Sequence, residues 1–110
     1  MDFDPEKIFH EVEAAGEKWA DAKAAYEALD DVTKSVLADI TSNFLDAGKI
    51  TKSEAEMRAF ASSQYKVHLA SVSAARKAWL FAQVKYESTK MLADLRRTQE
   101  SNIRAEMQLR

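Results

Sequence analysis

The sequence predicts an all-α fold, arranged as a long antiparallel helical hairpin of coiled-coil type. The chain has 110 residues but only two glycines and one proline, whereas a β-sheet needs many turns and therefore many such residues. Helix-forming Ala, Glu, Lys, Leu and Arg are abundant. One clear turn stands near the middle, at Gly48. We therefore expect a single helical domain over 1–110, with two helices joined by that turn.

The first helix is predicted from about residue 5 to 47. Pro5 suits the first turn of a helix, and Asp4 can cap it. Small or apolar residues then recur in alternating steps of four and three, which is the spacing of a helix packed against another helix. This first seam comprises Ile8, Val12, Ala15, Trp19, Ala22, Tyr26, Leu29, Thr33, Val36 and Ile40.

Asp30 and Asp31 form the one weak point in this helix, because either carboxylate could cap a new helix. The heptad spacing continues across them, so we expect a continuous helix. A chain broken there into three helices is the alternative.

The turn is predicted at 48–52, and the second helix from about 53 to 110. Gly48 can stop the first helix, and Thr51 or Ser53 can cap the second. No strong helix breaker follows Lys52. Since the second helix is longer, residues from about 94 to 110 should overhang the first. An isolated helical tail of this length is marginal in water, so it needs a partner.

The two halves of the chain carry opposite charge, which favours the antiparallel arrangement. Residues 1–47 hold 12 acidic side chains and 4 Lys, a net of −8, and residues 48–110 hold 6 acidic and 12 basic side chains, a net of +6. A reversal at Lys49–Ile50 places Trp19 beside Trp79 and Leu80. It also places an acidic stripe, formed by Glu13, Glu17 and Asp21, near basic residues of the second helix: Arg76, Lys77, Lys85 and Lys90.

The residues that most chemistry requires are missing from the sequence, so we expect no enzymatic activity, no cofactor and no metal. There is no Cys, which removes thiol catalysis and thiolate metal sites. His10 and His68 lie far apart in the hairpin, and neither belongs to a helical metal motif. The carboxylates follow a solvated helix face, with no glycine-rich phosphate loop nearby.

The sequence Trp79-Leu80-Phe81 predicts that the protein does not act alone. On a helix these side chains point in directions that span about half the circumference, whereas one neighbouring helix covers about a third. A second neighbour is required. It comes from a second copy, in a homodimer that forms a four-helix bundle, from a helix broken at Asp30-Asp31, or from the target, which we expect to be another protein. The predicted protein-interface residues are Trp79, Phe81, Leu95, Ile103 and Met107.

Two other functions are compatible with the sequence. A nucleic-acid-associated recombination or replication accessory protein could use the basic residues Lys85, Lys90, Arg96, Arg97 and Arg104. Alternatively, the acidic stripe of Glu13, Glu17 and Asp21 could imitate the charge of a duplex and occupy a nucleic-acid-binding protein. A membrane-surface helix is disfavoured by the mixed charges of the overhang, and no run of about 18 apolar residues predicts a membrane span.

Two stretches, "GEKWADAKAAYEALDDVTKSVLADI" and residues 50–107 from "ITKSEAEM" to "SNIRAEM", resemble small, largely uncharacterised helical proteins of bacteriophages and prophages of proteobacteria. The resemblance carries over no catalytic residue. It implies a phage or mobile-element protein in the cytoplasm of a bacterial host, such as a host-takeover factor, an anti-defence inhibitor or a recombination accessory. The acidic N-terminus has no apolar segment, so we expect no secretory signal.

Overall fold

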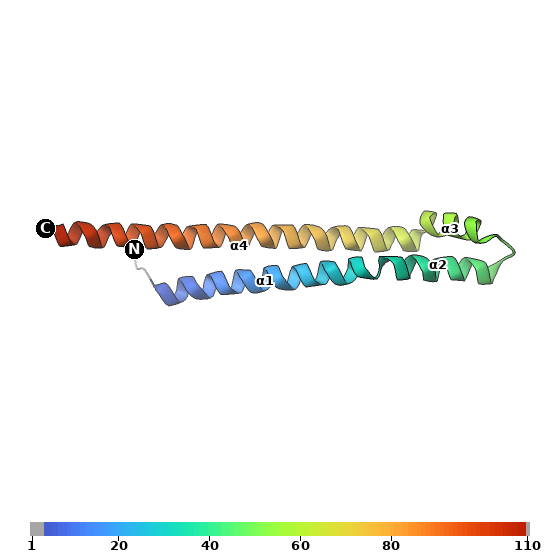
Figure 1. The fold of residues 1–110 in the computed structure, drawn as a ribbon, viewed down its shortest axis with the longest axis horizontal. Helices are drawn as coiled ribbons and strands as arrows, with labels where there is room; N and C mark the ends of the chain where they lie inside the picture. The colour runs from blue at the N-terminus through green and yellow to red at the C-terminus, as the bar shows by residue number, and fades with distance from the viewer. Residues whose placement is uncertain (1–3, 110) are drawn as a thin grey trace. The chain divides into compact units, whose positions relative to one another are not determined.

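The structure is a computed structural model that describes residues 4–109, and these confirm the predicted all-α hairpin class (Figure 1). Its helices are α1 (Pro5–Asp31), α2 (Thr33–Ala47), α3 (Lys52–Ala61) and α4 (Ser63–Leu109). The chain divides into two compact units, which we call the terminal unit (1–21 with 79–110) and the turn unit (22–78). Within each unit, the first half of the chain runs antiparallel to the second half. The predicted helix end at Arg110 lies outside the described residues.

The N-terminus of α1 is capped as the sequence predicts. The Asp4 carboxylate oxygen Oδ1 accepts hydrogen bonds from the backbone N–H groups of Glu6 (3.1 Å) and Lys7 (3.3 Å). These bonds satisfy two of the four donors that a helix start leaves without intrahelical partners. All ten residues of the predicted first seam are buried or half-buried, while most of their neighbours are exposed. The heptad pattern therefore identifies the packed face of α1 and α2.

The predicted continuous first helix is wrong, because the structure interrupts it at Val32, directly after Asp30 and Asp31. Val32 has φ −90° and ψ 0°, yet its carbonyl still accepts a hydrogen bond from the N–H of Val36 at 2.9 Å. The Thr33 hydroxyl bonds the Leu29 carbonyl at 3.4 Å and the His68 ring at 2.8 Å. Because these bonds tie the break to α4, the helix bends without losing its heptad spacing.

The turn between α2 and α3 lies where the sequence places it. Gly48 ends α2 in an extended conformation (φ −155°, ψ 173°), so it makes no use of the left-handed region that favours glycine. Of the two predicted caps for the next helix, the structure uses Thr51, whose hydroxyl accepts from the N–H of Glu54 at 3.2 Å.

A second interruption, at Ser62, corrects the prediction of one unbroken helix from 53 to 110. Ser62 is extended (φ −69°, ψ 149°). Its hydroxyl donates to the Ala59 carbonyl (2.7 Å) and accepts from the N–H of Tyr65 (3.2 Å), so one side chain closes α3 and caps α4. The break also shifts the packed face. Ala55 and Ala59 of α3, and Ser62 directly after it, face inward, whereas the heptad of α4, extended backwards, would have placed Arg58 there.

Packing is closest in the turn unit, where α3 lies against α2. Ala55 and Ala59 on α3 are fully buried (0 % exposed), and Ile40 and Thr41 on α2 are also buried. In the terminal unit, where α1 packs against α4, the buried residues in the described part of the chain are Ala15 and Ala93. Small side chains at these positions let the helix backbones approach closely.

Candidate interaction surface

An aromatic stack joins α1 to α4 in the terminal unit. The Trp19 and Tyr86 rings lie face to face, with centroids 5.4 Å apart and planes inclined by 16°. The Lys90 ammonium lies 4.5 Å from the centroid of the Tyr86 ring, close enough for a cation–π contact. Gly16 leaves room for that ring, since a Cβ atom at Gly16 would stand 3.1 Å from Tyr86 Cε1. The stack thus fixes how α1 and α4 pair.

The structure stacks Trp19 on Tyr86, which lies farther from the turn than Trp79 and Leu80, the neighbours that the sequence predicts. The reason is the direction of helical side chains, which tilt towards the N-terminus of their own helix. In an antiparallel pair, the side chains of the two helices therefore tilt in opposite directions. A residue then meets a partner that lies farther from the turn than the residue level with its own backbone. Counting equal numbers of residues back from the turn on each helix ignores this tilt. For a long side chain, such a count therefore predicts a partner that lies too close to the turn.

The overhang of α4 is shorter than the predicted 94–110. Asp94 and Arg97 line a hollow together with Pro5 and Ile8 of α1, and Arg96 Nη1 lies 4.0 Å from Glu11 Oε2. The stretch in which every residue is exposed is 101–109. The side-chain tilt that displaces Trp19 also explains this difference, because α1 covers more of α4 than a backbone register predicts.

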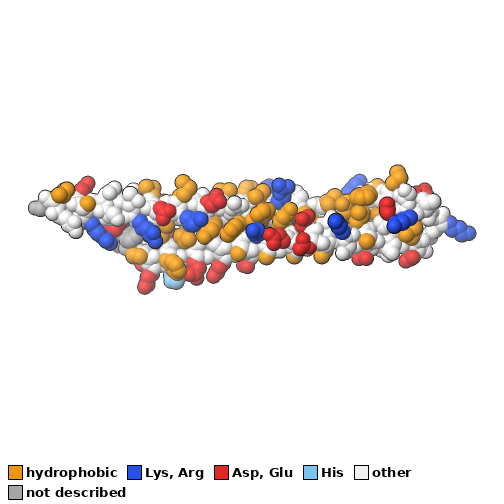
Figure 2. Space-filling view, in the orientation of Figure 1, with side chains coloured by type: hydrophobic (Ala, Val, Ile, Leu, Met, Phe, Trp, Pro, Cys, Tyr) orange, Lys and Arg blue, Asp and Glu red, His pale blue; other side chains and the backbone are white. Residues whose placement is uncertain are grey.

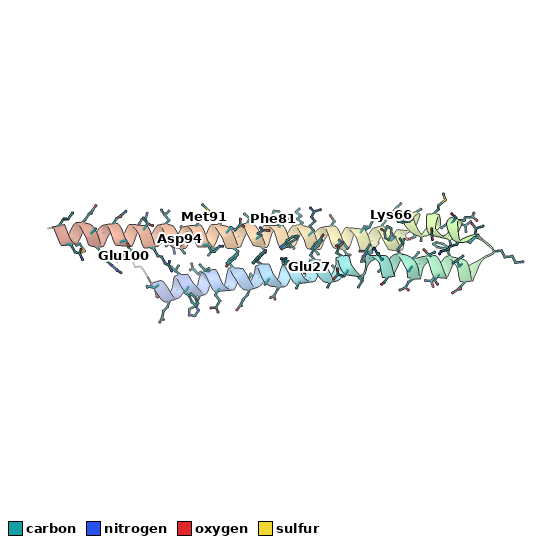
Figure 3. All side chains as sticks on the ribbon, viewed as in Figure 1. Glu27, Lys66, Phe81, Met91, Asp94 and Glu100 are labelled. Carbon is teal, nitrogen blue, oxygen red and sulfur yellow. The ribbon has the colours of Figure 1, made fainter. Side chains whose placement is uncertain are left out.

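A second apolar stripe runs along the side of α4 that faces away from α1. It comprises Phe81, Val84, Met91 and Leu95, which are between 54 % and 72 % exposed. Figure 3 shows Phe81 and Met91 on this side of α4, opposite Glu100. We call these four residues the outer face of α4. Sequence reasoning named Phe81 and Leu95 but missed Val84 and Met91. The signal was present, because positions 81, 84, 88, 91 and 95 follow the same steps of three and four as the first seam.

The predicted interface residues do not form one surface. Phe81 and Leu95 belong to the outer face of α4, whereas Trp79 is half-buried on the face of α4 that packs against the first half of the chain. Ile103 and Met107 continue that inward heptad past the start of α1, and there they are 51 % and 70 % exposed. A single neighbouring helix thus leaves Leu80 and Phe81 exposed, as the Trp79-Leu80-Phe81 argument anticipates.

The basic residues proposed for nucleic-acid contact are partly engaged within the terminal unit. Arg96 faces Glu11, Arg104 Nε lies 3.8 Å from Glu100 Oε1, and Lys90 lies over the Tyr86 ring. Lys85 and Arg97 are exposed and make no ion pair with the residues that the structure describes. The five side chains therefore do not act as one unopposed positive surface.

The acidic stripe of Glu13, Glu17 and Asp21 is exposed along α1. The sequence places this stripe near basic side chains of the second helix, yet within residues 4–109 none of the three carboxylates takes part in an ion pair. In Figure 2 acidic side chains follow the α1 edge of the terminal unit, and Lys and Arg follow α4. The stripe is therefore available to an outside partner.

A groove runs between α1 and α4 on one side of the terminal unit. It consists of two adjoining hollows of about 260 and 450 Å³, which share Phe9 and Val12. Its floor also includes Gly16, Trp19, Tyr86 and Ala93. Glu13 and Glu17 line the α1 edge, and Lys90, Asp94 and Arg97 line the α4 edge. We call this feature the α1–α4 groove. It is mainly apolar, and its two edges differ in charge.

The described residues offer neither a metal site nor a membrane span. Within 4–109, no three His, Asp or Glu side chains are arranged to hold a metal ion. Of the two histidines, His68 bonds Thr33 in the turn unit, and His10 is an exposed residue beside Phe9. No described helix combines the length and the apolar character that crossing a bilayer requires.

Comparisons with protein-family models, with curated proteins and with solved structures give no match for this chain. What the protein does must therefore be argued from its own surfaces.

Proposed function

We propose that the protein is a non-enzymatic helical interaction protein, which binds another protein through the outer face of α4. One observation carries this proposal: four large apolar side chains at heptad spacing stand exposed on α4, and Figure 3 shows two of them, Phe81 and Met91, on the side away from α1. Scattered apolar residues are normal on a protein surface, but an ordered stripe is typical of an interface. A helix of a partner packs naturally on such a stripe.

The resemblance to phage and prophage proteins supports a setting for this interaction. We include in the proposal that the partner is a host or phage protein in a bacterial cytoplasm, and that binding inhibits a host function or a defence system. A homodimer with a four-helix bundle, in which the outer faces of two copies meet, is an alternative use of the same face.

Capture experiments with the full chain would test this function. The wild-type protein and the double variant Val84→Glu/Met91→Glu are compared as baits in host lysate, with Gln99→Glu/Ser101→Glu as a control that adds the same charge to other exposed positions of α4. A protein retained by the wild type and the control, but lost with the outer-face variant, supports the proposal. Equal retention by all three baits, at equal helicity, contradicts it.

A second candidate function is an acidic mimic of nucleic acid, favoured by the exposed stripe of Glu13, Glu17 and Asp21, which forms no ion pair among the described residues. In that case Glu13→Gln/Glu17→Gln/Asp21→Asn should abolish inhibition of a nucleic-acid-binding target, while the outer-face variant should not.

The nucleic-acid accessory function has less support, because Arg96 and Arg104 face carboxylates. It predicts binding to duplex or single-stranded DNA that falls steeply as salt rises. Absence of binding at low salt would exclude it.

A further inference from the structure

The α1–α4 groove and the outer face of α4 carry matching features on two sides of α4 that meet at Asp94. The groove has an apolar floor with Glu13 and Glu17 along one edge, and with Lys90 and Arg97 along the other. The outer face has an apolar ridge with Lys85 along one flank, and with Glu87 and Asp94 along the other. A ridge with a basic and an acidic flank is what a groove with an acidic and a basic edge can accommodate.

We propose that the α1–α4 groove of one molecule receives the outer face of α4 of a second copy. The inference rests on the proposed function, in that it takes the outer face to be an interface, and it names the surface which that face binds. The apolar part of the fit is direct: Val84 and Met91, exposed in one copy, would cover Phe9, Val12 and Gly16 of the other.

The charges fix the direction of the incoming helix. In a right-handed helix that runs the same way as the α4 it joins, Lys85 comes to the α1 edge and meets Glu13 and Glu17. Glu87 and Asp94 then come to the α4 edge. A helix that runs the opposite way would bring like charges together at both edges, which is unfavourable. The two α4 helices therefore lie parallel.

The same charges fix the axial position. A displacement of three residues brings Glu87 level with Lys90, and also Asp94 level with Arg97. Three residues correspond to a shift of about 4.5 Å along the helix axis. At that shift, Lys85 lies level with the stretch of α1 between Glu13 and Glu17. Asp94 lines the groove in its own molecule as well, so it reduces the positive charge of the α4 edge without reversing it.

The contact is heterologous, because it joins two different surfaces. A copy whose outer face fills the groove of a second copy still has an open groove of its own. The second copy, in turn, still has an exposed outer face. Assembly therefore continues beyond two copies, until the rotation closes a ring or the chain of copies ends. A symmetric homodimer, in which the same surface meets itself, would stop at two.

Complementation between two variants tests this contact. Glu13→Lys/Glu17→Lys reverses one edge of the groove and keeps the outer face, while Val84→Glu/Met91→Glu breaks the outer face and keeps the groove. All four positions lie on exposed or edge sites, and circular dichroism checks that helicity is unchanged. By sedimentation velocity at low salt, the wild type should form species larger than a dimer. Each variant alone should be monomeric, with self-association weakened at least ~10-fold for the lost charge and apolar contacts.

Mixing the two variants should restore a 1:1 dimer and nothing larger, because only one intact groove and one intact outer face are then available. Adding Lys85→Glu to the groove variant should recover part of its self-association. A monomeric wild type, a mixture that stays monomeric, or a wild-type dimer that both variants still form would each overturn the inference.

These results separate the inference from the proposed function. A monomeric wild type, whose outer-face variant nevertheless loses a captured host protein, leaves the proposed function standing and removes the self-contact. A wild type that assembles and passes the mixing test, but captures no other protein, keeps the self-contact and removes the foreign partner.

Discussion

The two units differ in how fully the residues at their helix–helix contacts are buried. In the turn unit α3 lies against α2, and two alanines on it are fully buried. In the terminal unit α1 and α4 pair alone, and even the alanines at their contact keep 7 % and 9 % of their surface exposed. A helix with one neighbour can bury only a stripe of its surface, so the remainder of α4 stays open. The difference teaches that two alanines facing α2 bury the α2–α3 contact more completely than Ala15 and Ala93 bury the contact in the terminal unit.

The aromatic stack is the point at which the terminal unit should be easiest to break. Tyr86→Ala removes the ring that contacts Trp19 and Lys90. We expect unfolding free energy to fall by about 2–3 kcal/mol, below the usual cost for a fully buried aromatic because Tyr86 is half-buried. Urea unfolding followed by circular dichroism measures it. Phe81→Ala is the matched control and should cost less than about 1 kcal/mol at low protein concentration. Equal losses would mean that the stack does not hold this unit together.

The close packing of the turn unit should make it intolerant of added volume. Ala59→Leu inserts three carbons into a fully buried position between α3 and α2. We expect a loss of about 1–3 kcal/mol, since overpacking forces side chains and backbone to move. Ala61→Leu, on the exposed side of the same helix, should change stability by less than about 0.5 kcal/mol. Thermal unfolding of the two variants gives the comparison, and a neutral Ala59→Leu would show that the α2–α3 contact is loose.

Ser62 lies inside the turn unit between α3 and α4, and it allows α3 to turn its alanines towards α2. Ser62→Ala removes the hydroxyl that bonds both Ala59 and Tyr65. The expected loss is about 1 kcal/mol, the usual value for a helix cap. Ser63→Ala is the control, since no side-chain hydrogen bond of Ser63 appears among the described residues, and it should be near neutral. The midpoints of urea unfolding measure both stability changes, provided that the unfolding free energy depends on urea concentration with the same slope in both variants. A loss no greater than that of the control would show that the cap contributes nothing.

The two glycines give the smallest and most direct contrast. Gly48→Ala should stabilise by about 0.5 kcal/mol, because its backbone is extended, nothing lies within 4 Å of an added Cβ, and the unfolded chain loses freedom. Gly16→Ala gains about 1 kcal/mol of helix propensity. Its Cβ, however, would stand 3.1 Å from the Tyr86 ring, which Trp19 holds from its face. We therefore expect no net gain at Gly16. A melting temperature that rises more for Gly16→Ala than for Gly48→Ala would contradict this.

Much of the fold could be predicted from local and periodic features. Features that depend on neighbours in the sequence agree with the structure. These are the cap at Asp4, the end of α2 at Ala47 and the seam from Ile8 to Ile40. The outer face of α4 could also have been found, since its spacing repeats that of the first seam. The prediction named only two of its residues, Phe81 and Leu95. It combined them with Trp79, Ile103 and Met107, which follow the inward heptad instead.

The sequence by itself determined that the chain is helical, where it reverses, and which face of α1 packs, because capping and periodicity are properties of residues a few positions apart. Tertiary structure alone decided the stacking of Trp19 on Tyr86, the break at Ser62 and the groove between α1 and α4. These depend on the tilt of long side chains and on the approach of helices that are distant in sequence. The interaction surfaces follow from the same cause: a heptad identifies an apolar face, but only the packed molecule shows which faces are left uncovered.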